Sequence, residues 1–156
     1  MSYWDTLEIG RVQELGSHTF EKDEIVRFAR KYDPQPFHLD EEAAHASTLG
    51  GLCASGWHIT AAMMRLLVDF RRAEVAAHIA AGNPAPLLGP SPGVTNIRWL
   101  KPVFAGDTLT YRATVTGKRA SKSKVGWGVV ESHTTATNGA GTEVFSLDAA
   151  AFVGTD

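Results

Sequence analysis

The longest apolar stretch of the chain lies near its middle. Between Trp57 and Phe70 almost every residue is apolar, and on a helix with about 100° per residue His58, Arg65 and Asp69 share one narrow polar stripe. A helix that is apolar on nearly every face must be enclosed by other structure, and this one is too short to cross a bilayer. The pattern predicts a central helix wrapped by a sheet, with the polar stripe at a seam or a subunit contact. A plain core helix is the simpler alternative.

Shorter helical patterns precede this segment. Thr19 and Asp23 suit the N-cap and the first turn of a helix, and the apolar positions that follow recur at helical spacing. Pro34 and Pro36 end this helix, because the residue before a proline avoids helical geometry. Residues 40–47 begin with acidic side chains, which predicts a second, short helix.

In the second half of the chain, apolar and polar residues alternate with a period of two residues. Residues 82–93 hold four of the seven prolines and predict a connection, which follows a helix that reaches about Ala81. Apolar and polar residues then alternate over residues 108–116, as on a strand with one buried face. Other strands are predicted near residues 6–18, 97–99, 125–129 and 143–153, the last after a hairpin turn at residues 138–141. Early helices and late consecutive strands favour an α+β fold with a largely antiparallel sheet, in one domain over residues 1–156.

Composition and charge narrow the class of protein. Of the 156 residues, 44% are hydrophobic and 21% are charged, which is typical of a globular domain with a real core. The formal net charge of -2 lacks the basic excess of a nucleic-acid-binding protein. Cys53 is the only cysteine, and the N-terminus shows neither the basic nor the apolar part of a secretory signal. We therefore expect a cytoplasmic protein with no nucleic-acid partner and no membrane partner.

The side chains that carry chemistry concentrate just before the apolar helix. They are Asp33, His38, Asp40, His45, Ser47, Cys53, Ser55 and His58. No motif with metal-ligand spacing occurs among them, so we expect no metal site. Cys53 and Ser55 also lack the sequence context of a catalytic nucleophile, and small residues before a helix more often permit close packing.

A third interpretation of this segment is acid–base chemistry. Asp33 and His38 are separated by a stretch in which Pro34 and Pro36 each fix the backbone angle φ. A carboxylate and an imidazole held in this way can share the handling of one water molecule. A helix that begins at Gly56 would direct unpaired N–H groups outward, where they can polarise a carbonyl and stabilise an enolate oxygen. A turn aspartate beside a structural histidine is the simpler alternative.

Several motifs in the same order resemble the MaoC-like hydratase/dehydratase family, of the (R)-specific enoyl-CoA hydratase type. The matching stretches are residues 32–40, Ala43 and Ala44, residues 50–52, residues 54–56, residues 97–103 and residues 106–109. The resemblance covers most of the chain between about residues 20 and 116. It implies a hotdog fold, in which an antiparallel sheet wraps around a long central helix, and an assembly as a homodimer or higher homo-oligomer.

The resemblance also implies a reaction and a set of site residues. The substrate is a trans-2-enoyl thioester of coenzyme A, or the 3-hydroxyacyl-CoA in the reverse direction, and the enzyme adds or removes water without a cofactor. Asp33 and His38 match the catalytic pair of the family, Gly56 matches the backbone donor to the thioester carbonyl, and Ser55 matches a small or polar position beside it.

Three further expectations concern substrate recognition. Gln35 stands where the family typically has Asn, and this departure puts the local turn in question because Gln is one methylene longer. Residues 72–92 are expected to shape the acyl end of the pocket. Phosphates of coenzyme A are expected to meet basic side chains, for which a solvated surface is the simpler interpretation. The candidates are Arg98, Lys101, Lys118, Arg119, Lys122 and Lys124.

Two other functions remain open at the level of the sequence. A hotdog thioesterase often takes an acid from the central helix, but Asp69 is 13 residues beyond Gly56, or about 20 Å along a helix. A non-catalytic acyl-CoA binding module belongs to a different class. Binding alone has no need of a paired Asp33 and His38.

Overall fold

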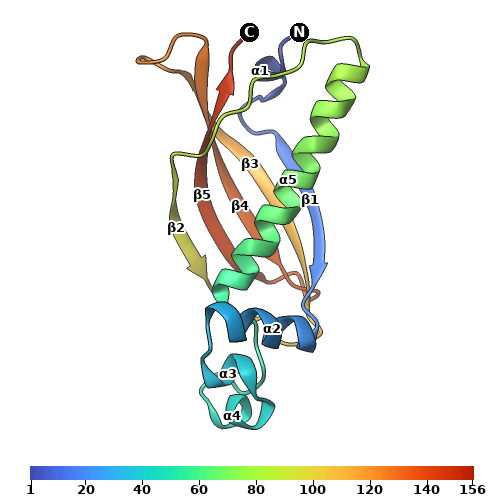
Figure 1. The fold of residues 1–156 in the computed structure, drawn as a ribbon, viewed down its shortest axis with the longest axis vertical. Coiled ribbons are helices and arrows are strands. Elements are labelled where there is room, and N and C mark those ends of the chain that lie inside the picture. The colour runs from blue at the N-terminus through green and yellow to red at the C-terminus, as the bar shows by residue number, and fades with distance from the viewer.

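Five antiparallel strands form one curved sheet (Figure 1). The computed structural model describes residues 1–156 of the chain. The strands are β1 (Val12–Thr19), β2 (Gly93–Trp99), β3 (Thr108–Ala120), β4 (Trp127–Thr137) and β5 (Glu143–Gly154), and they lie in the order β1-β3-β4-β5-β2. The helices are α1 (Tyr3–Thr6), α2 (Lys22–Tyr32), α3 (Pro36–Leu39), α4 (Glu41–Ala46) and α5 (Gly56–Ala80). The four consecutive late strands and the α+β class agree with the expectation from the sequence.

Helix α5 runs across one face of the sheet, and α2, α3 and α4 lie together beyond one end of it (Figure 1). The N-terminal half of α5 buries Ile59 and Met63 in a core shared with strand side chains such as Leu109 and Phe145. Tyr111 on β3 is fully buried, and its hydroxyl donates to the Ile59 carbonyl at 2.9 Å. A long helix against an antiparallel sheet is the hotdog fold that the sequence predicted.

The start of α2 corrects one expectation. The N-cap of α2 is Glu21, not Thr19. Thr19 is instead the last residue of β1, where it is paired with Thr108 of β3 and the two hydroxyl oxygens are 2.7 Å apart. Pairing in the sheet therefore overrides the local capping preference of threonine.

The proline-rich segment after α2 folds into two short helices. Helix α3 begins at Pro36, a position that suits proline because the first helical residue needs no N–H donor. Helix α4 occupies the predicted second helix, and the Asp40 carboxylate caps it by accepting from the Ala43 N–H at 2.8 Å. These turns hold the chain between Asp33 and Gly56 close to the end of α2.

The predicted polar stripe of α5 is divided between two environments. His58 is buried beneath α2, whereas Arg65 and Asp69 form an exposed ion pair with a 2.7 Å contact. None of the helices, α5 included, has the length and hydropathy that a membrane span requires.

The docking of α1 on the sheet depends on a glycine in β4. A Cβ atom added at Gly128 would lie 2.2 Å from Cη2 of Trp4, so the indole ring occupies the space of the missing side chain. We expect Gly128→Ala to lower the free energy of unfolding by about 1–3 kcal/mol, because the overpacked ring must move. Urea unfolding followed by circular dichroism measures the change. Gly139→Ala is the control, because nothing lies within 4 Å of a Cβ there, and equal losses for both variants would contradict the prediction.

Candidate active site

The ends of two helices bring the predicted site residues together. Asp33 is the C-cap of α2, His38 lies in α3, and Ser55 and Gly56 are the N-cap and first residue of α5. They come from one continuous segment, and the turns within this segment bring Asp33 into contact with Ser55. The structure therefore collects the four predicted residues Asp33, His38, Ser55 and Gly56 at one end of α5.

Asp33 is held by two side-chain donors. The Ser55 hydroxyl donates to Oδ2 at 2.7 Å, and the Gln35 amide donates to Oδ1 at 2.6 Å. Burial alone would raise the pKa of the Asp33 carboxyl. The hydrogen bonds from Ser55 and Gln35 and the nearby His38 lower this pKa by more, so the net pKa is below its ordinary value. Asp33 is therefore a carboxylate at neutral pH, with fixed orientation.

His38 has a defined tautomer because of one main-chain contact. Its Nδ1 lies 2.6 Å from the Cys53 carbonyl oxygen, which only accepts hydrogen bonds, so Nδ1 carries the proton. The Nε2 atom of a neutral ring is then an acceptor, and it lies 3.4 Å from Oδ2 of Asp33. Two acceptors that face each other at this distance form a site for the protons of one water molecule.

The first turn of α5 supplies a free backbone donor. The Ser55 hydroxyl accepts from the Trp57 N–H at 3.3 Å, and the Ser55 carbonyl accepts from the N–H groups of His58 and Ile59 at 3.0 and 3.1 Å. The Gly56 N–H takes part in none of these bonds. It therefore stays available to an oxyanion, at a helix end where the aligned peptide dipoles favour negative charge.

A cleft contains both His38 and Gly56. Its lining also includes Ile59 and the segment from Trp99 to Val103. The indole of Trp99 packs directly over Gly56, because a Cβ at this glycine would lie 2.4 Å from two atoms of the ring. Glycine is therefore required at this position for a steric reason as well as for approach to the backbone.

Two residues have roles that the sequence did not predict. Gln35 was expected to alter the turn, and its longer side chain instead reaches back to the Asp33 carboxylate. Cys53 was considered only as a nucleophile. Its main-chain carbonyl sets the His38 tautomer, whereas burial raises the pKa of its thiol and disfavours the reactive thiolate. A main-chain role leaves no signal in the residue type.

The family model for the MaoC like domain matches residues 6–138. The chain belongs to the MaoC-like dehydratase family. The uncharacterized protein YdeM of Bacillus subtilis (strain 168) is 30% identical over 122 residues, which cover 78% of this chain and 79% of YdeM. This confirms the family that the sequence motifs indicated, and it supports a hydratase or dehydratase in general terms.

Solved structures agree with this assignment. The MaoC-like dehydratase from Rhodospirillum rubrum is 35% identical, with a TM-score of 0.79 and coverage of 96% of this chain and 94% of that one. The (R)-hydratase from A. caviae is 21% identical, with a TM-score of 0.67 and coverage of 94% and 96%, and it shows the same fold. The MaoC-like fold therefore extends over almost the whole chain.

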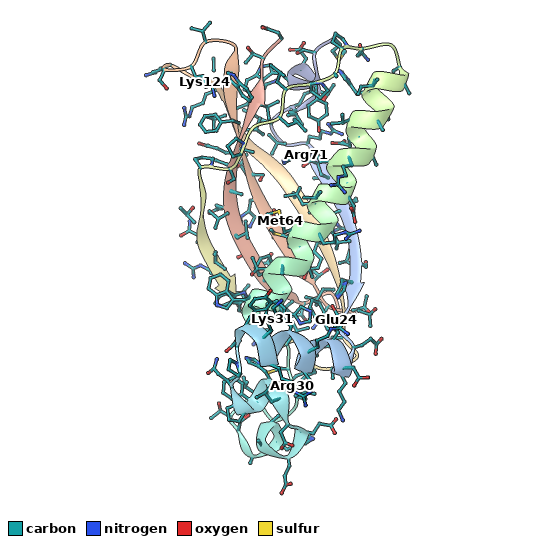
Figure 2. All side chains as sticks on the ribbon, in the orientation of Figure 1. Glu24, Arg30, Lys31, Met64, Arg71 and Lys124 are labelled. Atoms are coloured by element: carbon teal, nitrogen blue, oxygen red, sulfur yellow. The ribbon has the colours of Figure 1, made fainter.

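The basic residues proposed as phosphate contacts are spread over the MaoC-like domain. Lys101 lines the cleft with His38, and Arg98 lies nearby on β2. Lys118 donates to the Trp4 carbonyl at 2.6 Å. Lys124 lies at the end of the sheet opposite to Arg30 and Lys31 of α2 (Figure 2). The turn between β3 and β4 therefore lies at the opposite end of the sheet from α2.

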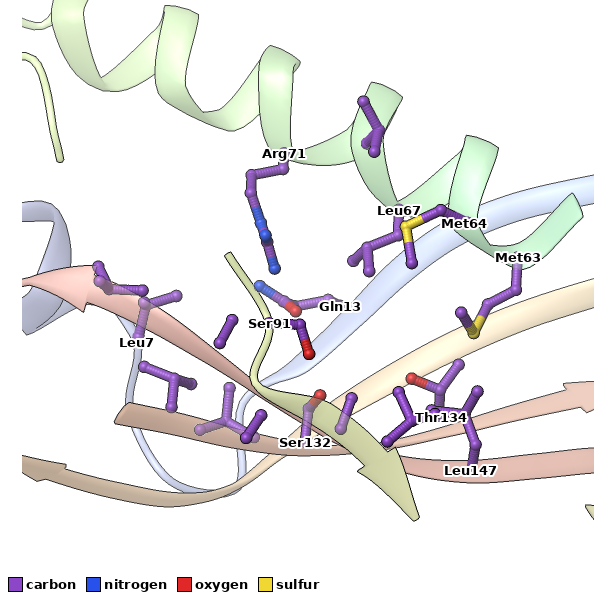
Figure 3. A pocket seen from close by; sticks show the side chains of 18 of the residues that line it. Leu7, Gln13, Met63, Met64, Leu67, Arg71, Ser91, Ser132, Thr134 and Leu147 are labelled. Atoms are coloured by element: carbon purple, nitrogen blue, oxygen red, sulfur yellow. The ribbon is translucent and has the colours of Figure 1, made fainter. Parts of the chain in front are cut away.

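A larger apolar cavity of about 300 Å³ separates the middle of α5 from the sheet (Figure 3). Met63, Met64 and Leu67 line it from α5, and the side chain of Arg71 points toward Gln13 and Ser91. Ser91 is its one lining residue from residues 72–92. This cavity shares no lining residue with the cleft that contains His38 and Gly56.

The Ser55 hydroxyl gives a direct test of the site electrostatics. We expect Ser55→Ala to raise the pKa of Asp33, because the substitution removes the donor that lies 2.7 Å from Oδ2. Carboxyl carbon shifts followed by NMR across an acid titration measure this pKa. Ser47→Ala is the control, because the Ser47 hydroxyl donates to Ala44 and not to Asp33. An unchanged Asp33 titration in Ser55→Ala would contradict the assignment of Ser55 as a major donor.

Proposed function

We propose that the protein is an (R)-specific enoyl-CoA hydratase, which reversibly adds water to a trans-2-enoyl thioester and gives a 3-hydroxyacyl-CoA. The observation that carries the proposal is the 3.4 Å separation of Asp33 Oδ2 and His38 Nε2, in a site where Gly56 offers a free N–H. Hydration of this double bond needs a group that orients and deprotonates water, a proton source for C2 and a donor for the enolate oxygen. In this proposal Asp33 orients the water, His38 takes a proton from it and supplies the proton to C2, and the Gly56 N–H is the donor to the enolate oxygen, without a cofactor.

The tautomer of His38 suggests the order of proton transfers. Water donates one hydrogen bond to Asp33 and one to His38, which directs an oxygen lone pair at C3 of the substrate. As the C3–O bond forms, Nε2 takes a proton from the water and the double-bond electrons move to the thioester oxygen, which the Gly56 N–H stabilises. The imidazolium, stabilised by the Asp33 carboxylate, then returns its proton to C2. Delivery from one side gives syn addition.

Named relatives support this class of reaction. Structures with the same fold include the (R)-hydratase from A. caviae, described as involved in PHA biosynthesis, and R-Hydratase PhaJ1 from Pseudomonas aeruginosa. A thioesterase has less support, because Asp69 is exposed and engaged by Arg65 far along α5. A binding module would have no use for the arrangement of Asp33, Ser55 and His38.

The catalytic pair can be tested with crotonyl-CoA. We expect the wild type to remove the absorbance of the conjugated thioester, and Asp33→Asn and His38→Ala each to lower kcat/KM by about 10²–10⁴-fold, because each removes an acid–base group. His45→Ala is the control, since this histidine is exposed in α4. If crotonyl-CoA does not react, longer and branched enoyl-CoA esters are tested next. Release of free thiol by the wild type, or full activity in both variants, would contradict the proposal.

We further propose that the protein acts as a homodimer. β2 is an edge strand with a free side, and its Val94 lines the large cavity together with Met64 and Val68 of α5. All three residues are at least 37% exposed in the single chain. An unpaired edge beside a connected apolar surface is a common site of self-association, and a two-fold axis would cover both at once.

Light scattering after size-exclusion chromatography measures the assembly. We expect a mass of twice 16.8 kDa for the wild type. Val94→Asp should shift the population toward monomer, because it places a charge in the apolar contact. Glu42→Lys, on α4 beyond the end of the sheet, should leave the mass unchanged because Glu42 is exposed there. A monomeric wild type would overturn the proposal.

A further inference from the structure

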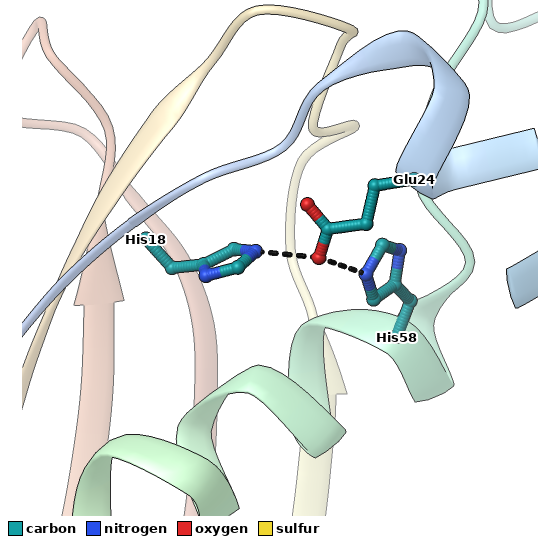
Figure 4. A group of neighbouring side chains, drawn as sticks. All are labelled: His18, Glu24 and His58. Carbon is teal, nitrogen blue, oxygen red and sulfur yellow. Dashed lines mark hydrogen bonds and ion pairs between the residues drawn. The ribbon is translucent and has the colours of Figure 1, made fainter.

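A second polar cluster lies outside the catalytic pair, at the seam between α2 and α5 (Figure 4). It consists of His18 at the end of β1, Glu24 in the first turn of α2 and His58 in the first turn of α5. Oε1 of Glu24 lies 2.7 Å from Nε2 of His18 and 3.0 Å from Nε2 of His58. One atom from each residue thus converges on a single point, and all three atoms lie within 4.8 Å of one another.

The cluster is polar in an aromatic setting. The His58 side chain is only 6% exposed, and its ring stacks on Phe28 with a centroid distance of 4.7 Å and an interplanar angle of 8°. Phe20 meets the same ring edge-on at 5.0 Å. Burying a polar ring among aromatic groups is costly unless its polar atoms find partners. The proposed hydration reaction makes no use of these three residues.

We propose that His18, Glu24 and His58 bind one divalent transition-metal ion of the Zn(II) type. Two imidazole nitrogens and one carboxylate oxygen are ligands that zinc accepts, whereas Mg(II) and Ca(II) prefer oxygen ligands. In a tetrahedral site with bonds of about 2.0–2.1 Å, ligand atoms lie about 3.3 Å apart. The carboxylate oxygen retreats slightly from both nitrogens to reach this arrangement, and the two imidazoles close around the ion.

The site has an open side. The His18 and Glu24 side chains are 32% and 27% exposed, so water has access to the fourth coordination position. An open fourth position beside three protein ligands is also the pattern of zinc sites that hold a water molecule.

The surroundings of His58 limit the affinity. Its Nδ1 is buried and has no hydrogen-bond partner. Metal-bound histidines usually donate this second ring N–H to an acceptor, and removal of such a partner weakens binding by about 10–100-fold. We therefore expect dissociation constants in the micromolar range rather than the tighter binding of a fully supported structural site.

Metal binding at this site would affect the stability of the fold and not only the proposed reaction. An ion held by Glu24 and His58 would fasten α2 to the first turn of α5, and β1 would be attached through His18. The expected consequence is greater stability of the fold, and this consequence does not require that the protein hydrates a thioester.

Co(II) is the probe for the test, because its visible absorption reports on coordination. Full-length protein, freed of any histidine tag and treated with a chelator, is titrated with CoCl₂ and then with ZnCl₂. We expect one Co(II) per chain with visible bands, displacement by Zn(II) but not by Mg(II), and a rise in Tm of about 5–10 °C at a Zn(II) concentration of 100 times Kd.

Substitutions of the ligands decide whether the ion occupies this site. His18→Gln and Glu24→Gln change partly exposed side chains, and each should weaken Co(II) binding at least tenfold while far-ultraviolet circular dichroism stays unchanged. His133→Gln is the matched control, because His133 is also a strand histidine paired with a carboxylate, Asp148, at 2.6 Å. Absence of binding at millimolar Co(II) or Zn(II) would leave a hydrogen-bonded cluster only and overturn the proposal. Undiminished binding in both ligand variants would overturn it as well.

Discussion

The hydroxyl group of Ser55 connects the parts of the structure on which the site depends. It accepts from the Trp57 N–H at 3.3 Å, which caps α5, and it donates to the Asp33 carboxylate at 2.7 Å, which fixes the end of α2. An N-cap side chain usually accepts one hydrogen bond from a backbone N–H of the first turn and makes no second contact of importance. Here the same oxygen sets the distance between the Asp33 carboxylate and the helix end that carries the Gly56 N–H.

The sequence placed the side chains of the proposed site together because they lie close together in it and follow a recognisable motif. Asp33 and His38 are five residues apart across Pro34 and Pro36, and the short helix α4 and a glycine-containing loop lead on to Gly56. The central helix was equally predictable as an element, but the single chain encloses it only on one side, and Met64 and Val68 stay exposed. Strand positions followed from alternation, as in β3, where the side chains of Leu109, Tyr111 and Val115 are buried.

Other features depend on contacts between distant residues, which no local pattern records. Thr19 has a local preference for a helix cap, but pairing with Thr108 places it in a strand. The Cys53 carbonyl, which sets the His38 tautomer, is a main-chain group and has no signature in the sequence. The cluster of His18, Glu24 and His58 comes from three separate elements, so a search for ligand spacing along the chain cannot find it.

Helix α2 is attached at both ends to the first turn of α5. Glu24, in its first turn, bonds to His58, and Asp33, at its C-cap, bonds to Ser55. A single attachment would allow α2 to pivot and would change the position of Asp33 relative to the Gly56 N–H. Two attachments on the same turn of α5 remove this freedom, because a rotation that relaxes one contact stretches the other. The Asp33 carboxylate and the Gly56 N–H therefore keep their geometry even though they lie on different helices, and the cluster around Glu24 contributes to the proposed site without touching a substrate.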